Sequence, residues 1–177
     1  MSKITLQNVR LSFPSLWRKA VFGGDETKYE GTFLLDKTTH ADVIKKIEAG
    51  IKAINADKHK GKALASDKVC LKDGDTIDYD GYAGNMSIKA SSTKRPMVVG
   101  RDKAPLTEDD GKPYAGCYVN AIVELWGQKN QFGERVNANL LAVQFAKDGE
   151  PFGDGVMASI DDFDEIVIED SDMDDFI

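Results

Sequence analysis

Apolar and polar residues alternate along several stretches of the chain, which is the pattern of β-strands buried on one face. The first stretch covers residues 3–13, and its phase changes at Gln7–Asn8, which predicts a β-bulge within a long strand. A second stretch covers residues 28–36 and a shorter one residues 85–91. The segment 14–27, which contains Gly23 and Gly24, is expected to be a loop.

Two longer alternating stretches follow near the end of this regular part of the chain. Residues 114–127 and 135–147 have the composition of strands, and the connector between them contains Phe132–Gly133. Such a pair with a short glycine-containing connector predicts a β-hairpin. After residues 148–149 the regular pattern stops.

One segment has a helical period instead. Apolar residues recur at helical spacing in residues 40–56, and lysines lie on the opposite face, so this segment is predicted to be an amphipathic helix. Thr39 and Asp42 have the spacing of a helix-capping pair. Five long strands with one helix after the second strand predict a mainly β fold, a five-stranded Greek-key barrel with an inserted helix. A single mixed α+β sheet also fits this order.

The length of 177 residues suits one domain with an appendage. We predict a binding domain at residues 1–155 and a disordered acidic tail at 156–177. The net charge of −7 averages two unlike parts: residues 161–177 hold nine of the 30 acidic residues and no basic one, which leaves 23 basic and 21 acidic residues in 1–160. No apolar run has the length expected of a membrane span or a leader peptide. The two cysteines, Cys70 and Cys117, are far apart in the sequence and are expected to be unpaired core residues of a protein in a reducing cytoplasm.

Residues for catalysis are sparse. The two histidines, His40 and His59, lie apart from other candidate ligands and are expected to be surface residues. Four carboxylates could hold a divalent ion for a nuclease-like reaction, although they do not fit a calcium loop and are also typical of a solvated turn. They are Asp73, Asp75, Asp78 and Asp80. A metal-dependent nuclease is therefore an alternative hypothesis, but no metal or other cofactor is expected.

The residue types favour nucleic-acid binding. Aromatic rings stack on unpaired bases, and lysine or arginine contacts the phosphates, so aromatic residues beside cations suit a single strand. The candidate phosphate contacts are Lys89, Lys94, Arg95 and Arg101. The candidate stacking residues, in or near predicted loops, are Trp17, Tyr79, Tyr82, Trp126 and Phe132. Burial in the core is the alternative for the aromatic residues, and above all for the two tryptophans.

The acidic segment 161–177 also contains apolar residues and ends in an apolar pair. Such a tail can occupy a cationic groove in place of DNA, while its tip docks in an apolar pocket of a protein partner. The tail residues assigned to this role are Asp172, Asp174, Asp175, Phe176 and Ile177. Two alternatives remain open: a solvating end, or a DNA-mimic or adaptor protein that acts through the tail alone.

Three stretches carry a family resemblance: ITLQNVRLSFPSLW, MSIKASSTKRPMVVGRD and GCYVNAIVELWGQKNQFGERVNANLLAVQFAKDGEPFG. Together they make most of residues 3–155 similar to a phage-encoded single-stranded DNA-binding family. The resemblance implies an OB-fold core that coats single-stranded DNA during phage replication or recombination, in the cytoplasm of an infected bacterium and without catalysis. The acidic end also resembles the tails of other single-stranded DNA-binding proteins, which recruit replication proteins. Those tails end in Phe, whereas here Phe176 is followed by Ile177.

Overall fold

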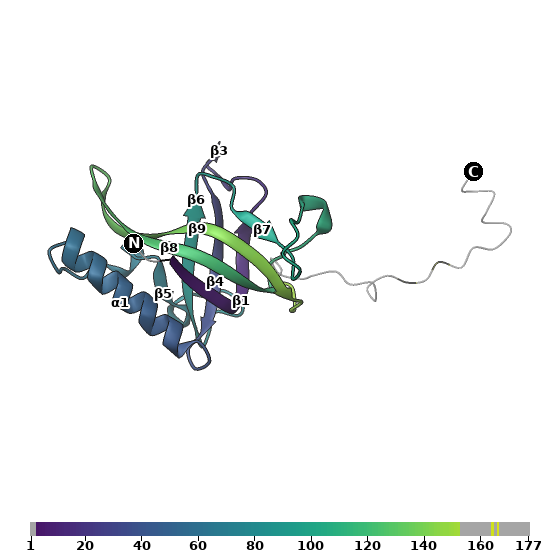
Figure 1. The fold of residues 1–177 in the computed structure, drawn as a ribbon, viewed down its shortest axis with the longest axis horizontal. Helices are drawn as coiled ribbons and strands as arrows, with labels where there is room; N and C mark the ends of the chain where they lie inside the picture. Colours follow the sequence, from purple (N-terminus) through teal and green to yellow (C-terminus); the bar gives the residue numbers. More distant parts are fainter. Residues whose placement is uncertain (1–2, 153–163, 165, 167–177) are drawn as a thin grey trace.

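The computed structural model describes residues 3–152, 164 and 166. The described chain forms nine strands, one α-helix and three short 3-10 helices (Figure 1). The strands are β1 (Lys3–Ser15), β2 (Val21–Phe22), β3 (Asp25–Glu26), β4 (Tyr29–Asp36), β5 (Leu71–Asp73), β6 (Asn85–Ser92), β7 (Met97–Val99), β8 (Tyr118–Asn130) and β9 (Gly133–Lys147). The helices are α1 (Ala41–Lys58), η1 (Ser66–Lys68), η2 (Gly74–Thr76) and η3 (Glu108–Asp110).

Five strands close a barrel. Their order is β6-β4-β1-β8-β9, and β9 returns to pair in parallel with β6 at Ser91 and Asn139. This closure confirms the five-stranded barrel with a helix inserted after its second long strand, and it is not an open mixed sheet. β5 extends the sheet beside β6, and β7 pairs with β9. Among the described residues, no helix is long and apolar enough to cross a membrane.

The predicted bulge in β1 is confirmed. The register against β8 shifts between Leu6 and Val9, and Asn8 lies within the shift with a φ of 53°. Asn8 N–H donates to the Asn120 side chain at 2.8 Å, so the extra residue keeps a partner. The shift brings apolar residues on both sides of the bulge, Leu6 and Val9, to the same interior.

The barrel interior is the hydrophobic core. Leu11, Phe33 and Ile88 form one inward row across β1, β4 and β6, and all three are fully buried. Burying an aliphatic or aromatic side chain of this size contributes about 1.5–3 kcal/mol. Such rows, repeated around the barrel, make its wall a rigid platform for whatever lies on the outer face.

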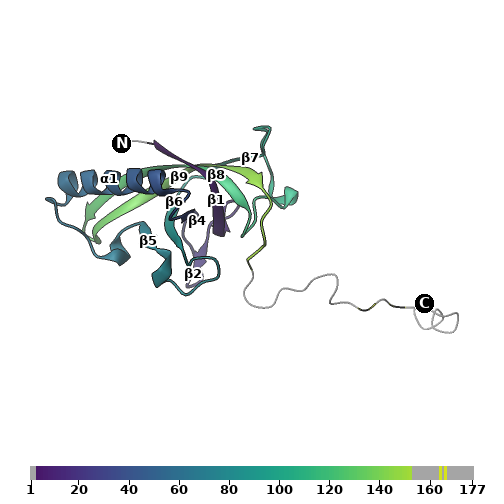
Figure 2. The ribbon, with the colours of Figure 1, turned by 90° about the horizontal axis from the view of Figure 1, so that it is seen from below.

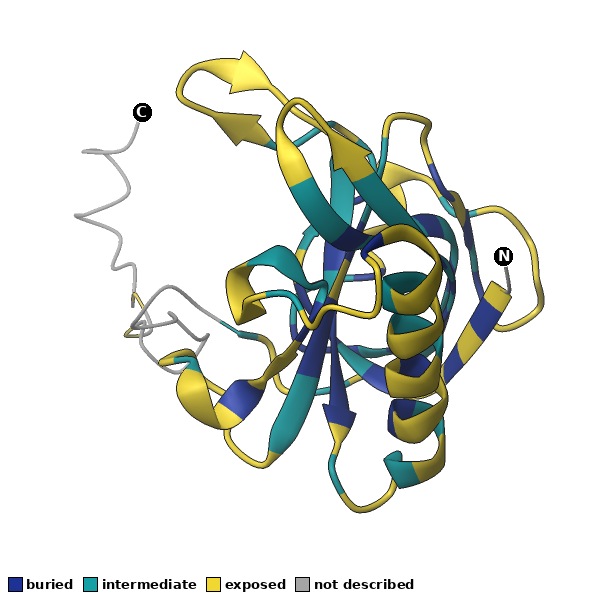
Figure 3. Ribbon diagram, turned by 90° about the vertical axis from the view of Figure 1, so that its left-hand side faces the viewer, coloured by how far each residue is buried: buried dark blue, intermediate teal, exposed yellow. Residues whose placement is uncertain are grey.

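Helix α1 lies along β8 and β9 (Figure 2) and turns its apolar stripe toward the barrel, while its lysine-rich face stays exposed (Figure 3). Ile44 and Ile47 are buried in this contact. Gly127 of β8 permits the close approach, because a Cβ there would lie 2.7 Å from the Ile54 side chain. The amphipathic helix predicted from the sequence is confirmed, with bounds moved by one or two residues.

The predicted capping pair is wrong. Thr39 and Asp42 do not cap α1; instead, Asp36 accepts the backbone N–H groups of Thr38 and Thr39 at 2.8 and 2.9 Å. These two bonds stabilise the charged carboxylate and lower the pKa of Asp36. The turn before the helix is therefore held from the end of β4.

Other differences concern short elements. β2 and β3 form a small hairpin inside the predicted loop 14–27, and β5 and β7 have three residues each, too few to show a period. The β8–β9 hairpin starts later and turns more tightly than predicted, with only Gln131 and Phe132 between the strands. The boundary predicted at residue 155 lies outside the described residues.

Candidate nucleic-acid interface

The outer face of β1, β4 and β6 carries polar side chains. Because side chains alternate between the faces of a strand, the row next to the buried one points away from the core. This outer row consists of Ser12, Thr32 and Lys89, which lie opposite one another across the three strands. Lys89 is exposed. We call this surface the β4–β6 face, because β4 and β6 are the second and third strands of the barrel. In five-stranded Greek-key barrels, the face of these two strands commonly contacts oligonucleotides.

A hollow of about 540 Å³ lies between this face and the β2–β3 hairpin; we call it the outer-face groove. Its lining combines two lysines, one acid and several apolar or small residues: Ala20, Val21, Phe22, Thr27, Lys28, Glu30, Lys89 and Ser91. Phe22 is 83% exposed at the rim. The hairpin is tied at its base, where Ala20 N–H donates to Lys28 O at 2.8 Å and Thr27 N–H donates to Ala20 O at 2.7 Å.

Lys89 supplies one of the two cations that line the groove. Its Nζ lies 3.3 Å from Glu30 Oε2, and the lysine end of this pair is largely exposed to solvent. The glutamate side chain is 19% exposed, but the lysine end is 60% exposed, and solvent screening there weakens the pair, so a phosphate can replace the carboxylate as the partner of the lysine. Glu30 therefore acts as an internal competitor for any anion in the groove.

Two further predicted cations follow β6 directly. Lys94 and Arg95 are exposed in the loop after the strand. Arg95 Nη2 donates to Trp17 O at 2.8 Å, which ties this loop to the segment that leads into the β2–β3 hairpin. Lys94 N–H donates to Ser92 Oγ at 3.1 Å, at the end of β6 that is level with the start of β4. Lys89, Lys94 and Arg95 thus lie on β6 and the loop that follows it.

Arg101 lies apart from these three. Its Nε–H donates to the carbonyl of Ala146, and its guanidinium is 5.8 Å from the Phe145 ring centroid. Ser91 lines the groove and pairs with Asn139 of β9. Ala146 is seven residues further along β9, about 23 Å at the usual rise of a strand. The structure therefore does not bring Arg101 into the outer-face groove.

The predicted aromatic residues differ in exposure. Tyr79 is 58% exposed, whereas Tyr82 is only 3% exposed and its hydroxyl donates to Ser12 Oγ at 2.8 Å. The two rings meet edge to face with centroids 5.4 Å apart. Trp17 is half-buried against the core. Tyr79 thus has an open ring, and Tyr82 supports it from below.

Trp126 and Phe132 belong to the long β8–β9 hairpin. Trp126 is half-buried opposite Asn137, two residues along β9 from Asn139 and on the same outer face. Since Asn139 pairs with Ser91, this face continues the surface that carries Lys89. Phe132 is 75% exposed in the two-residue turn. In Figure 1 this turn and the β2–β3 hairpin both protrude beyond the barrel.

The sequence prediction did not include Phe13 and Lys28. Phe13 is exposed, and its ring centroid lies 5.0 Å from that of Tyr79. Lys28 lines the groove from the foot of the β2–β3 hairpin. Phe13 continues the alternation of β1 and is therefore indistinguishable from a core residue in the sequence. Its positive φ of 46° at the end of the strand turns it outward, which no periodicity predicts.

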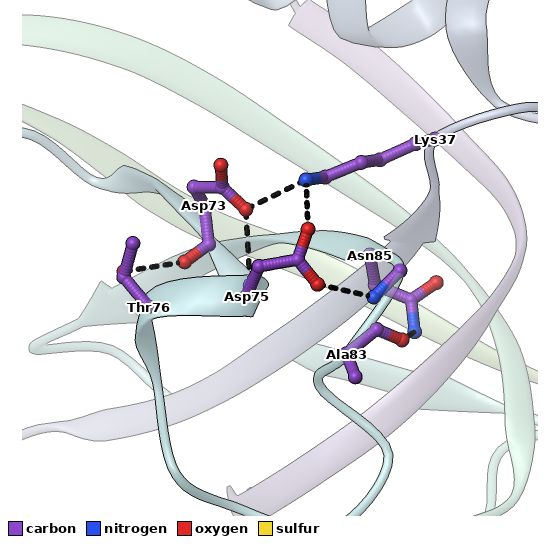
Figure 4. A network of polar contacts seen from close by, with 7 residues as sticks. Lys37, Asp73, Asp75, Thr76, Ala83 and Asn85 are labelled. Atoms are coloured by element: carbon purple, nitrogen blue, oxygen red, sulfur yellow. Dashed lines mark hydrogen bonds and ion pairs between the residues drawn. The ribbon is translucent and has the colours of Figure 1, made fainter.

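The stretch from Asp73 to Asp80, which holds the four predicted carboxylates, includes a salt-bridged turn (Figure 4). Lys37 Nζ lies 2.7 Å from Asp73 Oδ1 and 2.6 Å from Asp75 Oδ2. These bonds to the lysine are the largest cause of the lowered pKa of both carboxyl groups. Asp75 Oδ1 also accepts the Gly84 N–H at 2.8 Å. Asp78 and Asp80 are exposed, and within residues 3–152 no group of three or more acidic, histidine or cysteine side chains could hold a metal ion.

The histidine prediction is wrong for His59, which is buried. Its Nδ1 lies 3.1 Å from Glu134 Oε1, and its Nε2 lies 3.2 Å from Arg135 O, so the ring joins the end of α1 to β9. His40 is half-buried, and its Nδ1 accepts the Asp36 N–H at 2.9 Å. Cys117 is buried and Cys70 half-buried, and burial raises the pKa of Cys70 to about 11, as expected for unreactive core thiols.

The tail residues assigned to partner binding lie outside the described residues. They are Asp172, Asp174, Asp175, Phe176 and Ile177. The segment that leads to them is described as far as Phe152, whose N–H donates to Ala115 O at 3.0 Å. Phe152, the last residue of the continuously described chain, therefore lies beside Ala115.

Comparison with known proteins identifies relatives along the whole chain. Residues 2–177 match the family described as the single-stranded DNA-binding protein of Enterobacter phage Enc34. Protein p50 of Acyrthosiphon pisum secondary endosymbiont phage 1 is 44% identical over 174 residues, which cover 93% of this chain and 94% of that protein.

Two solved structures are similar in fold and sequence. The single-stranded DNA-binding protein from bacteriophage Enc34 is 33% identical, with a TM-score of 0.78, over 92% of this chain and 90% of that chain. The same phage protein in complex with single-stranded DNA is 34% identical, with a TM-score of 0.77, over 85% of this chain and 89% of that chain.

Proposed function

The chain belongs to the phage single-stranded DNA-binding protein family described by the protein of Enterobacter phage Enc34, a family without enzymatic activity, and we propose that it binds single-stranded DNA without sequence preference across the β4–β6 face. The observation that carries this proposal is the outer-face groove, where Lys89 lies among exposed apolar and aromatic groups. A single strand needs this combination, because its phosphates are charged and its base faces are free.

The phosphates would contact the cations of β6 and the loop after it. Three of these cations follow one another along β6 and the loop after it: Lys89, Lys94 and Arg95. Lys28 adds a fourth cation from the β2–β3 hairpin side of the groove. Each phosphate that a lysine or arginine neutralises releases a counterion, so binding should weaken as salt rises. Arg101, which lies apart, would contribute through the general field only.

The bases would stack on the open rings. Tyr79 and Phe22 flank the β4–β6 face, and Trp126 and Phe132 extend it along the β8–β9 hairpin. Stacking accepts every base, since each has an aromatic face, and this supports binding without sequence preference. Tyr82 would act indirectly by supporting Tyr79, and Trp17 by shaping the loop that Arg95 holds.

The cellular role follows from this chemistry and from the family. We propose that the protein coats exposed single strands during phage DNA replication or recombination in the cytoplasm of the bacterial host. The acidic residues 161–177 would compete with DNA for the cations of the groove, and the tip at Phe176–Ile177 would recruit replication or recombination proteins. The continuously described chain ends at Phe152, beside Ala115 and near the end of β1, and the acidic segment 161–177 begins nine positions later in the sequence.

Fluorescence anisotropy of a labelled oligo-dT tests these proposals. The full chain and a chain ending at Gly155 would be titrated at two salt concentrations; the shorter chain retains Phe152 and its contact to Ala115. Salt-sensitive binding by both chains, tighter for the shorter one, is expected. Equal affinity of the two chains would overturn the competition by the tail, and the absence of binding by both would overturn the DNA-binding proposal.

A further inference from the structure

A second hollow, of about 660 Å³, lies between helix α1 and strand β8; we call it the α1 groove. Ile4 and Leu125 line it from the barrel, and Ile54 lines it from the helix. Ala49 and Ala53, which are exposed on α1, add only methyl groups to its wall. The α1 groove shares no lining residue with the outer-face groove, so an occupant of one leaves the other open.

The rim of the α1 groove is charged. It carries Lys46, Lys58 and Asp57, and all three are exposed. Within residues 3–152, no ion pair includes either of these lysines. The helix and the loop after it, residues 41–62, hold six lysines and three acidic residues, so the field over this surface is positive. The groove therefore suits an occupant that is both apolar and negatively charged.

The end of the acidic segment has this composition. Residues 161–177 contain nine acidic residues and no basic one. In Asp174–Ile177, which we call the tail tip, two carboxylates directly precede Phe176 and Ile177. We propose that the α1 groove binds the tail tip of the same chain, with the two apolar side chains on the groove floor and the two carboxylates toward the rim lysines.

The chain is long enough for this contact. The continuously described part ends at Phe152, whose N–H donates to Ala115 O. Leu125 is ten residues from Ala115 and therefore at most about 36 Å away. The 24 residues from Phe152 to Phe176 can extend to at most about 85 Å, and a flexible chain of that length has a root-mean-square span of about 27 Å.

The same distances favour the tail tip of the same chain over that of a second copy. A linker whose root-mean-square span is close to the distance it must bridge gives its ligand an effective concentration on the order of millimolar. A second copy supplies its tail tip only at the concentration of the protein. Charge complementarity and reach therefore point to the same occupant.

Binding in the α1 groove would regulate the recruitment proposed above. A tail tip held in the groove is withheld from protein partners, and the apparent affinity of a partner falls in proportion to the fraction of chains whose tip is free. The biological meaning of this inference rests on the proposed recruitment, but the contact itself can be tested without DNA and without a partner.

The test uses the full-length protein with Phe176→p-benzoylphenylalanine, a photocrosslinking residue that is also aromatic. After irradiation without DNA, the chains are separated on a denaturing gel and the digested bands are analysed by mass spectrometry. We expect crosslinks within single chains to the α1 groove, above all to Ile54 and Leu125.

Substitutions at the rim and in the tail tip test both parts of the contact. The double variant Lys46→Glu with Lys58→Glu should lower the yield of these crosslinks about 5-fold or more, because two attractions become repulsions. Lys45→Glu with Lys52→Glu makes the same change of net charge on the same helix but outside the groove, and should lower the yield less than about 2-fold. Ile177→Ser should also lower the yield, because it removes apolar contact area.

Crosslinks to the outer-face groove, or spread evenly over the barrel, would overturn the proposal. An equal fall in the two double variants would also overturn it, since the general field alone produces that result. Crosslinks found only between two chains would overturn the assignment to the same chain. If thermal unfolding shows that a lysine variant is not folded, Ile177→Ser decides, and an unchanged yield would overturn the proposal. Failure of the unchanged protein to bind oligo-dT is a separate result, which would overturn the proposed function and leave the crosslinks standing.

Discussion

The ion pair between Lys89 and Glu30 makes a quantitative prediction about DNA affinity. Lys89 Nζ is 3.3 Å from Glu30 Oε2 in the free protein, on the β4–β6 face that we assign to DNA. If a phosphate replaces Glu30, Lys89→Ala removes one phosphate contact, whereas Glu30→Gln removes a competitor for the same cation. The two substitutions should therefore act in opposite directions.

The magnitudes follow from the exposure of the pair. Loss of one contact to a single strand lowers the slope of log affinity against log salt by about 0.7, which corresponds to about 2.6-fold over a fourfold rise in salt. The lysine end of the pair is 60% exposed, and solvent-screened pairs typically contribute about 0.2–1 kcal/mol, so Glu30→Gln should raise the affinity by about 5-fold at the upper end of that range. When Lys89 is already replaced by Ala, Glu30 has no cation left to block, so adding Glu30→Gln should raise the affinity less than Glu30→Gln does alone.

The assay is a set of anisotropy titrations with labelled oligo-dT at four or more salt concentrations. Lys45→Ala, on the exposed face of α1, is the charge-matched control, and its slope should change little. Thermal unfolding would confirm that each variant is folded. An unchanged slope in Lys89→Ala, or weaker binding by Glu30→Gln, would refute the assignment of this face to the phosphates.

Three further predictions concern the scaffold. Phe33→Ala, at a fully buried site between β1 and β6, should lower the free energy of unfolding in urea by about 3–5 kcal/mol; a loss below ~1 kcal/mol would contradict the packing described. Gly74→Ala should destabilise the protein and weaken oligo-dT binding, because its Cβ would collide with the carbonyls of Tyr82 and Asn85 that fix the loop under Tyr79; unchanged unfolding and binding would argue against it. Lys62 and then His59 lower the pKa of Glu134 from 4.5 to about 2, so their stabilising effect is complete above pH 4.5 and is lost as the pH falls toward 2. In urea unfolding, Glu134→Gln should be less stable than the unchanged protein at neutral pH, and its free energy of unfolding should depend less on pH between 4.5 and 2.

The long elements could be predicted from the sequence because their patterns are local. The alternation in β1 even locates its bulge, since the phase change at Gln7–Asn8 is written in consecutive residues. The helix is equally clear, because its apolar stripe recurs at helical spacing from Val43 to Ile54, about three turns. By contrast, β5 and β7 are only three residues long, and they exist because β6 and β9 offer them partners far away in the sequence.

The site was less predictable because it depends on contacts between distant residues. Tyr79 and Tyr82 are alike in the sequence, yet Tyr82 is buried, with its hydroxyl bonded to Ser12, 70 residues away, whereas the ring of Tyr79 is exposed. His59 is buried by Glu134 and Arg135, which only the fold brings to the end of α1. Composition suggested cations and aromatic residues, but the fold decides which of them share a surface.

The most direct test of the proposed DNA path is photocrosslinking of the full-length protein to an oligonucleotide containing 5-iododeoxyuridine, followed by mass spectrometry of the digested complex. The path across the β4–β6 face predicts crosslinks to the exposed rings that border it, above all Phe13, Phe22 and Tyr79. Crosslinks confined to α1 or to residues 100–113 would show that the DNA lies on a different surface.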